Sequence, residues 1–524
     1  MPTPSNSTEM HKMRLQSSLS ERQLSIWLCC ILLVGIGFRI AHVNRPLGHQ
    51  LQASWRQADE VQLARNFYRD GMNIFYPRID WRGDTPGYVE MELPLLPWVA
   101  ALLYHIFGYH EEFLRLLSAI LEITSLLLFG RLCRHVLPPV GAVFAVAAFA
   151  FNPLLIYLAT AMQPDPWMLL LCLAAMALIW RWQAKPKQTL LLGTAATIAA
   201  AILAKAPAAY LCFVFAYVVL RHYRWRAFTD IWVYLAVLIA TVPPLAWYAW
   251  AHQFWTLYGN SLGVSDESHF IGWDMIVPPT ALLGNLKWET LAVFTPLGWP
   301  LALAAWRAPR VWSEPALVWY GAVCIFYIVA ARTTAMYWAF YYHCVSVAPA
   351  CLLMGAGVAA FDRGGVLPRD WHWLRCREPW CGRILAVGTI AALIGATVIL
   401  IRTRDGRTDQ LQMQTCARQF VPYVPPLASI VVKGGYLLSV QGDPAAHNES
   451  MLFAWMDRKG FTYGIEELGI ATLDRIAARG GRYWIVHRSE LEPDNLQALA
   501  DQHYRLVATC PLGYSLYDLQ PSKR

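Results

Sequence analysis

The chain has 524 residues, of which 56% are hydrophobic and only 15% are charged. Soluble domains carry about a quarter charged residues, so this composition excludes a purely soluble globular protein. A net charge of +8 would suggest nucleic-acid binding in a soluble chain, but here the basic residues lie in short clusters between apolar stretches. Such clusters are typical of the inside-facing loops of membrane proteins, so no nucleic-acid partner is expected.

The apolar stretches predict a polytopic α-helical membrane protein. The first stretch begins near Ser25 and has no small-residue cleavage site, so we expect it to remain as an anchor after a cytoplasmic tail of residues 1–24. About 17–25 apolar residues are needed to cross the hydrocarbon core. The eleven predicted spans are 25–43, 113–133, 139–160, 165–182, 188–204, 207–221, 228–250, 288–306, 315–331, 336–358 and 384–401.

One further apolar segment, from Leu93 to Phe107, decides the orientation of the spans that follow it. It is short and contains two prolines. If it does not cross, the basic clusters and the amino-terminal tail fall on one side, as the positive-inside rule requires. We therefore predict a juxtamembrane or re-entrant helix on the outer face. The clusters are Arg131/Arg134, Arg181/Lys185/Lys187, Arg221/Arg224/Arg226, Arg307/Arg310 and Arg363/Arg369/Arg375/Arg377/Arg383.

This topology places four parts of the chain outside the membrane, where we expect the chemistry. They are the large loop 44–112, the short loop at Gln163–Pro166, the loop 251–287 and the carboxyl-terminal residues 403–524. The expected location is the bacterial inner (plasma) membrane, with the active site and the carboxyl-terminal domain on the periplasmic side.

From Thr403 onward the composition becomes soluble, and the pattern predicts a small α/β domain over 403–524. SIVVKGG, RYWIVH, RLVATC and YSLYDL are typical of short strands, with helical patterns at 446–459, 466–479 and 492–502. In an oxidising compartment Cys416 and Cys510 could form a disulfide or remain two thiols, and both alternatives stay open. The spacing of His372, Cys376 and Cys381 disfavours a zinc site.

The loop after the first span concentrates charged residues that a purely structural loop does not need. Asp59 and Glu60 are followed at helical spacing by Arg65, and a turn-rich stretch leads to Glu90 and Glu92. Carboxylates at a membrane surface are costly unless they are paired or used. We therefore predict a functional role for at least one of them.

The motifs WRQADEVQLARNFY, YVEMELPLLPWVAALLYHIFG, MQPDP, LAKAP and YYHCVSVAP resemble membrane glycosyltransferases of the GT-C class. In particular, they are similar to bacterial relatives of the protein mannosyltransferases and the lipid A aminoarabinose transferases, that is, PMT/ArnT-like enzymes. The resemblance implies a GT-C fold over 25–402 and an inverting sugar transfer from a polyprenyl-phosphate-linked donor. It also implies an aspartate base in the first outer loop, and Asp59 is the matching residue.

A carboxylate suits this reaction because it can accept the proton of an acceptor hydroxyl as that oxygen attacks the anomeric carbon. The departing phosphate needs positive charge and hydrogen-bond donors. Arg56 and Arg65 near Asp59 are candidates, as are Lys205, Arg332 and His343 at predicted outer span ends. Each has an alternative interpretation: Lys205 and Arg332 as snorkelling or interface residues, and His343 as a packed histidine.

A second acidic position is expected at Glu90 or Glu92, which follow the pattern of the relatives only loosely, and both remain open. Glu60 and Asp165 are further candidates for substrate binding, although Asp165 between prolines also suits a helix cap.

In the loop 251–287, His269 with Asp266 and Glu267 more closely resembles solvated loop than an acceptor lid. Some members of the class use a divalent metal and others do not, so the metal stays unassigned.

The expected partners are a polyprenyl-phosphate sugar donor, a glycan, lipid or protein acceptor, and membrane lipid. The alternative is a transporter or flippase of a lipid-linked sugar, whose coupling groups would lie at mid-membrane depth. Glu122 is the clearest acidic residue within an apolar stretch. The crowding of carboxylates in an outer loop favours the enzyme over the transporter.

Overall fold

The computed structural model describes residues 21–41, 43–45, 47, 54–265, 279–330, 334, 337–367, 377–403, 408–435, 450–464, 466–492 and 496–520. The chain divides into two compact units. Unit 1 comprises Met1–Val43, Arg115–Ala246 and Ser268–Ile401. Unit 2 comprises Asn44–Leu114, Trp247–Glu267 and Arg402–Arg524. Segments far apart in sequence therefore contribute to each unit.

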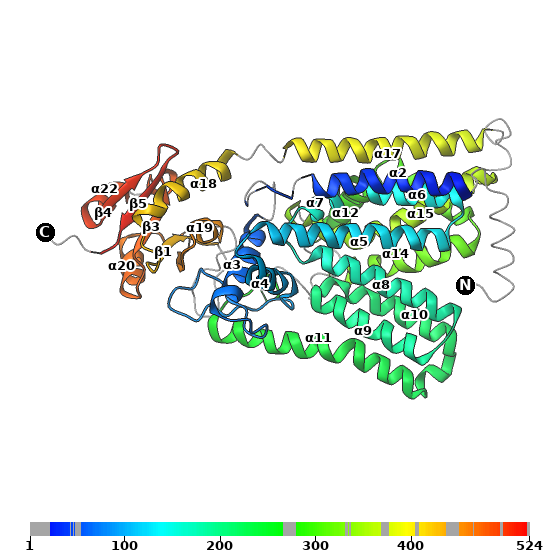
Figure 1. The fold of residues 1–524 in the computed structure, drawn as a ribbon, viewed down its shortest axis with the longest axis horizontal. Helices are drawn as coiled ribbons and strands as arrows, with labels where there is room; N and C mark the ends of the chain where they lie inside the picture. Colours follow the sequence, from blue (N-terminus) through cyan, green and yellow to red (C-terminus); the bar gives the residue numbers. More distant parts are fainter. Residues whose placement is uncertain are drawn as a thin grey trace. The chain divides into compact units, whose positions relative to one another are not determined.

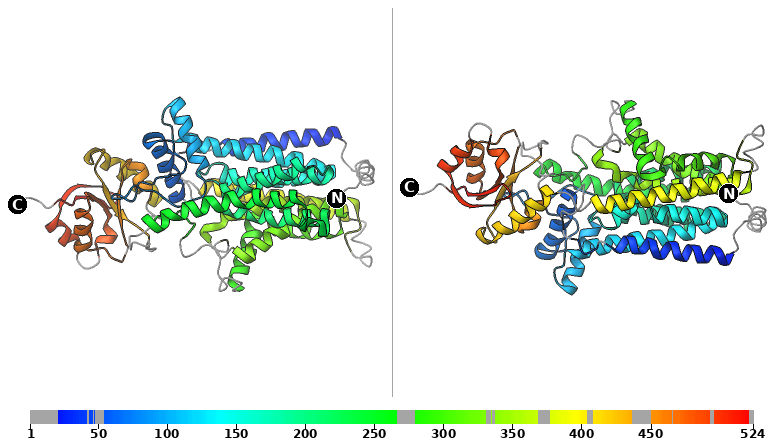
Figure 2. Two further views of the ribbon diagram at one scale, coloured as in Figure 1. Left: turned by 90° about the horizontal axis from the view of Figure 1, so that it is seen from below. Right: turned by 90° about the horizontal axis from the view of Figure 1, so that it is seen from above.

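Unit 1 is built from helices, whose long members run side by side (Figures 1 and 2). Helix α15 packs against α6 and α13, and α8 packs against α9. The helices with residues in this unit are α2 (Glu21–Ile40), α5 (Glu112–Val136), α6 (Pro139–Ala150), α7 (Pro153–Ala159), α8 (Asp165–Ala184), α9 (Gln188–Ala204), η1 (Ala206–Tyr210), α10 (Leu211–Tyr223), η2 (Arg224–Phe228), α11 (Ile231–Tyr258), α12 (Pro279–Trp288), η4 (Glu289–Phe294), α13 (Gly298–Ala304), η5 (Ala305–Arg307), α14 (Arg310–Ala330), η7 (Tyr337–His343), α15 (Cys344–Arg363) and α17 (Glu378–Thr403).

Within the described residues, 8 helices are long and apolar enough to cross a membrane, or up to 9 if the bent pair α6 and α7 forms one span. The chain is a multi-pass membrane protein, as its composition predicts. The predicted span 188–204 is a single helix, α9, of 17 residues. The predicted span 288–306 starts at the last residue of α12 and is then divided among η4, α13 and η5. The total of eleven spans therefore stays a prediction.

The division of the 288–306 segment has a local cause. Residues Glu289–Phe294 form a π-helix, and Thr295 after it has a φ of 62°. This value is unfavourable for a β-branched residue, and the following Pro296 removes a backbone donor. The helix therefore stops at Phe294 and starts again at Gly298. Hydropathy does not reveal this break because the residues on both sides are apolar.

Unit 2 contains the helices of the first large loop, α3 (Ser54–Asp70) and α4 (Leu95–Phe107), which pack against each other. Helix α4 has 13 residues, fewer than the roughly 20 that a span needs. It ends at Gly108, whose φ of 86° suits glycine. This agrees with a helix that does not cross the membrane, and its placement on the outer face stays a prediction.

The carboxyl-terminal part of unit 2 is an α/β structure, as predicted. Its five-stranded sheet has the order β2-β1-β3-β5-β4. Strand β1 is parallel to β2 and β3, whereas β5 is antiparallel to β3 and β4. The strands are β1 (Ile430–Lys433), β2 (Gly460–Tyr463), β3 (Tyr483–His487), β4 (Arg505–Thr509) and β5 (Tyr514–Asp518), and the helices are α18 (Thr408–Phe420), α19 (Ser450–Met456), α20 (Ile470–Ala478), α21 (Arg488–Leu491) and α22 (Leu496–His503).

Four of these strands lie in the segments that the sequence pattern marks, but the pattern misses β2. This strand has only four residues and begins with glycine, which is depleted in strands. Gly460 is required there because a Cβ would lie 1.8 Å from the carbonyl oxygen of Ile430 on the neighbouring strand.

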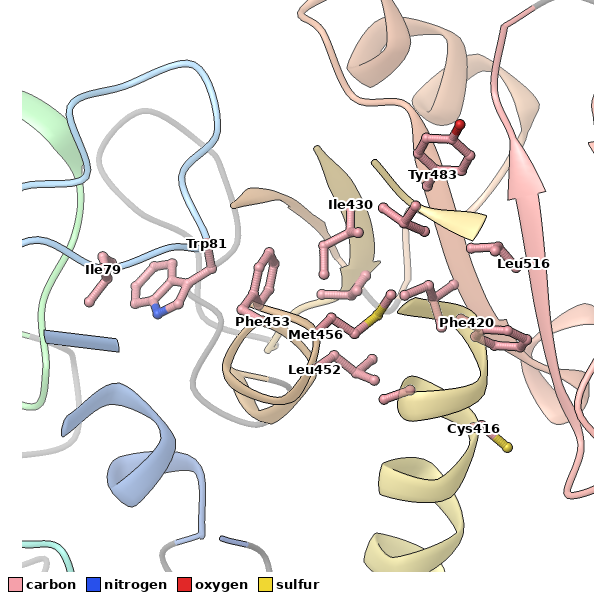
Figure 3. Packing of buried hydrophobic residues seen from close by; sticks show 14 of the residues in the cluster. Ile79, Trp81, Cys416, Phe420, Ile430, Leu452, Phe453, Met456, Tyr483 and Leu516 are labelled. Atoms are coloured by element: carbon pink, nitrogen blue, oxygen red, sulfur yellow. The ribbon is translucent and has the colours of Figure 1, made fainter. Parts of the chain in front are cut away.

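One hydrophobic core joins the first large loop to the carboxyl-terminal residues (Figure 3). Its buried members come from α3, the loop after it, α18, α19 and the sheet. They include Leu63, Ile79, Trp81, Met91, Phe420, Ile430, Leu452, Phe453, Met456, Tyr483 and Leu516. The loop that carries the predicted active site is thus folded together with the carboxyl-terminal sheet, within the same unit.

Cys416 and Cys510 form a disulfide, with Cα atoms 5.6 Å apart. This decides between the two alternatives that the sequence leaves open. The bond joins α18 to the turn between β4 and β5, across a sequence separation of 94 residues. In the zinc candidate, Cys381 is a free thiol, and His372 and Cys376 lie outside the described residues.

We expect the paired variant Cys416→Ser/Cys510→Ser to destabilise unit 2. Without the bond, the unfolded chain gains conformational entropy, and this lowers the free energy of unfolding by about 4 kcal/mol. Thermal unfolding of the purified protein measures the effect, with Cys381→Ser as the control because Cys381 is unpaired. Equal melting temperatures for the paired variant and the wild type would contradict this prediction.

Candidate functional site

Asp59 lies on α3 in the middle of a fully buried stretch, and its exposed fraction is 0%. Its Oδ1 accepts a hydrogen bond from the indole Nε1 of Trp81 at 3.1 Å. Its Oδ2 accepts no hydrogen bond of normal geometry from a described residue. The nearby hydroxyl of Ser450 donates instead to the carbonyl oxygen of Trp55, at 2.9 Å. Trp81 thus holds one carboxylate oxygen, and the other is buried without a hydrogen bond of normal geometry from a described residue.

The surroundings of Asp59 raise its pKa from the ordinary 3.8 to about 7. Burial is the largest cause, because it disfavours the charged carboxylate. The positive charge of Arg56 and the hydrogen bond from Trp81 lower the pKa, whereas the charge of Asp80 raises it. A base whose pKa lies near the working pH transfers protons efficiently.

Arg56 lies one turn before Asp59 on α3 and contacts two further carboxylates. Its Nη2 lies 2.5 Å from Oε1 of Glu92 and 3.1 Å from Oε1 of Glu60. All three side chains are buried. The structure thus brings together four of the candidates from the sequence, namely Arg56, Asp59, Glu60 and Glu92. Glu92 belongs to this cluster, whereas Glu90 does not.

Glu90 has other partners although it is only two residues away. Its Oε1 accepts a hydrogen bond from the hydroxyl of Ser265 at 2.8 Å and lies 3.0 Å from Nδ1 of His252. Its Oε2 has no hydrogen-bond partner among the described residues. Sequence reasoning missed His252, and no local signal marks it, because only the fold brings the end of α11 to Glu90.

Arg65 is enclosed by acceptors within unit 2. Its guanidinium lies 2.6 Å from Oδ2 of Asp80 and 3.0 Å from Oδ1 of Asp457, and it donates to the carbonyl oxygens of Phe453 and Ala454. Only 3% of the residue is exposed. This geometry suits a residue that holds α3 against α19, and a role of Arg65 in substrate binding stays a prediction.

In unit 1, Asp165 at the start of α8 pairs with Lys205. The Lys205 Nζ lies 2.8 and 2.7 Å from the two oxygens of the Asp165 carboxylate. It also lies 4.8 Å from the ring centre of Tyr341 and 4.6 Å from that of Tyr342. Asp165 is fully buried, while the Lys205 side chain is 12% exposed. The cation is therefore held in place by the MQPDP and YYHCVSVAP motifs, through one carboxylate and two aromatic faces.

His343 is fully buried, and both of its ring nitrogens have partners. Nδ1 lies 2.6 Å from Oε1 of Glu289, and Nε2 lies 3.0 Å from the carbonyl oxygen of Thr334. Glu289 on η4 also accepts hydrogen bonds from Ser346, Tyr320 and Tyr327. These contacts match the alternative of a packed, satisfied histidine. Sequence reasoning missed Glu289, although a glutamate within an apolar stretch is a signal that marks it.

Replacing Glu289 with Gln is expected to destabilise unit 1 by about 3 kcal/mol. If the amide oxygen replaces Oε1, which accepts from Ser346 and Tyr327, the NH2 group faces the Tyr320 hydroxyl. Buried hydrogen bonds to a charged carboxylate then become weaker bonds to a neutral amide. Thermal unfolding in detergent measures the loss. Glu314→Gln on α14 is the control, because Glu314 pairs with the exposed Arg221 and such pairs contribute little. A Glu289→Gln protein as stable as the control would show that the network is dispensable.

Glu122, the residue that bears on the transporter alternative, is fully buried on α5. It lies 3.9 Å from the guanidinium of Arg39 on α2, and neither of its oxygens has a hydrogen-bond partner among the described residues. The remaining candidates, Arg332 and His269 with Asp266 and Glu267, lie outside the described residues.

The described residues contain no group of three or more His, Cys, Asp or Glu side chains arranged to hold a metal ion. Around Asp59, a single guanidinium, that of Arg56, pairs with both Glu60 and Glu92. The metal therefore stays unassigned.

Comparisons with known proteins support the resemblance seen in the motifs. Residues 85–250 match the family described as dolichyl-phosphate-mannose-protein mannosyltransferase. A comparison with curated protein sequences gave no match.

Solved structures show similarity over almost the whole chain. The apo structure of ArnT from Cupriavidus metallidurans matches with a TM-score of 0.61 and 15% identity, covering 94% of this chain and 98% of that one. The same protein bound to undecaprenyl phosphate matches with a TM-score of 0.57 and 16% identity, covering 95% and 98%. The arabinofuranosyltransferase AftD from Mycobacteria has a TM-score of 0.52 and 13% identity, covering 97% and 40%.

At these identities the structural similarity establishes the fold. The chain has the GT-C fold of these membrane glycosyltransferases and resembles the PMT/ArnT-like members of that class, which confirms the resemblance inferred from its motifs.

Proposed function

We propose that this protein is an inverting glycosyltransferase that takes a sugar from a polyprenyl-phosphate-linked donor and transfers it to a hydroxyl group of a periplasmic or lipid-linked acceptor. Asp59 is the general base. The fold similarity to ArnT, which has been solved with bound undecaprenyl phosphate, supports this class of donor.

The observation that carries the proposal is the state of the Asp59 carboxylate. It is buried, Trp81 holds Oδ1, and Oδ2 is without a hydrogen bond from a described residue. Its pKa of about 7 makes it a stronger base than an ordinary aspartate. A purely structural carboxylate at this depth would be expected to have both oxygens satisfied.

The proposed reaction balances without a separate acid. The acceptor hydroxyl gives its proton to Oδ2 of Asp59 while its oxygen forms a bond to the anomeric carbon of the donor. On the opposite face the bond between that carbon and the phosphate oxygen breaks, and the polyprenyl phosphate leaves with the electron pair. Asp59 later releases its proton to solvent. Inversion at the anomeric carbon follows from attack opposite the leaving group.

Arg56 in unit 2 and Lys205 in unit 1 are proposed separately as residues that bind substrate phosphate. Arg56 carries a planar guanidinium that can bind phosphate through two hydrogen bonds, and Lys205 provides a point charge. Arg56 lies one helical turn from Asp59 in unit 2. Lys205 in unit 1 is fixed by Asp165 and by two tyrosine rings but keeps part of its surface exposed. Glu60, Glu92 and Asp165 would tune these charges, and Glu90 with its unpartnered Oε2 is proposed to bind the acceptor.

The proposed location is the bacterial inner membrane, with unit 2 on the periplasmic side. The charge distribution of the loops and the disulfide in unit 2 support this orientation. The acceptor is proposed to be a glycan, a lipid or a protein. One GT-C neighbour, the Archaeoglobus fulgidus oligosaccharyltransferase, was solved with an acceptor peptide, with a TM-score of 0.51 and 12% identity.

Mass spectrometry of envelope lipids and glycans tests the proposal. Cells that lack the gene, and cells that carry the wild type or Asp59→Asn, are compared. We expect one glycan or lipid species to lose a sugar in the deletion strain and in Asp59→Asn, and a polyprenyl-phosphate sugar to accumulate. Substrate translocation by reconstituted protein with no new glycosidic bond would support the transporter instead and overturn the proposal.

A further inference from the structure

Helix α19 of the carboxyl-terminal part of unit 2 packs against α3, the helix that carries Asp59. Gln62 Nε2 donates to the carbonyl oxygen of Ser450 at 2.8 Å, and the Ser450 hydroxyl donates to the carbonyl oxygen of Trp55 at 2.9 Å. Further along the two helices, Arg65 donates to the carbonyl oxygens of Phe453 and Ala454. The contact therefore extends along three turns of α3 and includes the turn of Asp59.

The backbone on both sides of Trp81 is fixed by strand β2. Gly460 donates its N–H to the carbonyl oxygen of Asp80 at 2.8 Å and accepts from the N–H of Gly83 at 2.7 Å. The N–H of Asp80 in turn donates to Oε1 of Gln62 at 3.0 Å. The loop segment 80–83 thus bridges β2 and α3, and Trp81 has little freedom to move.

The indole of Trp81 is fully buried and lies in the hydrophobic core beside Phe453 of α19, in a cluster that also includes Met456 (Figure 3). The indole has one donor and no acceptor. Its Nε1 uses that donor on Oδ1 of Asp59, at 3.1 Å. This donor, held in a fixed frame, orients the carboxylate, while Oδ2 is buried without a hydrogen bond of normal geometry from a described residue.

We propose that Trp81, held by α19 and β2 of the carboxyl-terminal domain, is a positioning residue that orients Asp59 so that Oδ2 faces the acceptor hydroxyl. The carboxyl-terminal domain thereby belongs to the catalytic machinery. This inference rests on the proposed function of Asp59 as the base, but the contact between Trp81 and Asp59 can be tested independently of catalysis.

Four groups face the Asp59 carboxylate from the elements around it. Arg56 lies on the same helix, Asp80 and Trp81 on the following loop, and Ser450 on α19. Of these, Arg56, Trp81 and Ser450 lower the pKa of Asp59 and Asp80 raises it. Removing the Trp81 donor takes away one of the groups that lower this pKa, while burial and Asp80 still raise it. The pKa of Asp59 must therefore rise further above 7.

The experiment compares full-length wild type, Trp81→Phe and Phe453→Leu in lipid nanodiscs. Trp81→Phe removes the donor but keeps an aromatic ring, and Phe453→Leu loosens the packing of α19 against Trp81. The protonated carboxyl band of Asp59 is titrated by infrared difference spectroscopy against Asp59→Asn. Trp98→Phe is the matched control, because its Nε1 donates to the carbonyl oxygen of Met72 instead.

We expect Trp81→Phe to raise the pKa of Asp59 by about one unit, the size of one hydrogen bond to a charged group. We expect Phe453→Leu to shift it in the same direction by less, and Trp98→Phe to leave it unchanged. With substrates, Trp81→Phe should lower kcat by about tenfold, leave the KM of the donor unchanged and move the acid limb of the pH profile upward. A purely structural role would not move the pH profile.

An unchanged Asp59 titration in folded Trp81→Phe would overturn the inference. If Trp81→Phe does not fold, an unchanged titration in Phe453→Leu would overturn it in the same way. If the titration shifts as expected but Asp59→Asn retains full sugar transfer, the contact stands and the proposed function of Asp59 fails. The two failures are therefore distinguishable.

Discussion

Asp59→Asn is expected to lower the rate of sugar transfer by about 10²- to 10⁴-fold, because the amide cannot accept the proton of the acceptor hydroxyl. The change keeps the size of the side chain and an oxygen for the Trp81 hydrogen bond. The rate is measured with purified protein in lipid, using the donor and acceptor identified by mass spectrometry. Full activity of Asp59→Asn would remove the general base from the mechanism.

Asp70→Asn is the matched control, since it makes the same chemical change at the other end of α3. Asp70 lies 2.9 Å from Lys459 and 3.6 Å from Arg78 in partly exposed ion pairs. Such pairs contribute little to stability, so this variant should transfer sugar nearly as well as the wild type. A similar loss of activity in both variants would indicate damage to α3 rather than loss of a base.

The activity and stability of the wild type and of Asp59→Asn should depend on pH in predictable directions. Because only ionised Asp59 acts as a base, kcat/KM of the wild type should fall about tenfold per pH unit below the pKa of about 7 and level off above it. The raised pKa means that the fold favours the protonated form, so stability is lost as pH rises from about 4 to 7. Asp59→Asn should therefore melt higher than the wild type at pH 8 and at a similar temperature at pH 4.

Lys205→Met is expected to have the second large effect, on both donor binding and stability. Loss of a charge-assisted contact to phosphate should weaken binding of undecaprenyl phosphate by about 10- to 100-fold. Removing the cation also leaves the fully buried Asp165 carboxylate without its partner, which costs about 3–5 kcal/mol. Binding to the protein in nanodiscs and thermal unfolding measure the two effects.

The double variant Asp165→Asn/Lys205→Met separates these two effects. It removes both charges, so its stability should recover most of the loss, while binding of undecaprenyl phosphate should stay weak. Recovery of binding in the double variant would mean that Lys205 only neutralises Asp165. In that case Lys205 would have no role of its own in binding phosphate.

Much of the candidate site could be predicted from short stretches of sequence. The spacing of Asp59, Glu60 and Arg65 is helical, and α3 carries all three. The length of the 93–107 segment and its two prolines correctly predict a short helix. The resemblance of the motifs to GT-C enzymes selects Asp59 from many acidic residues, and the fold comparison supports that class.

Contacts between distant residues could not be predicted in this way. Trp81 is one of 24 tryptophans, and nothing in its neighbourhood marks it as the donor to Asp59. Glu90 and Glu92 are equivalent in sequence, yet they point to different partners. Arg65 fits a phosphate clamp by spacing, but Asp80 and Asp457 already surround it.

Hydropathy and helical spacing are local properties of a few consecutive residues, so they predict the membrane class, the carboxyl-terminal α/β region and the acidic helix after the first span. The disulfide, the separate partners of Glu90 and Glu92, and the support of Asp59 by Trp81 and α19 depend on the tertiary fold. Gln62 and Ser450, which hold α3 to α19, are 388 positions apart. Hydrogen bonds and burial at such separations depend on how the whole chain folds, so no local pattern encodes them.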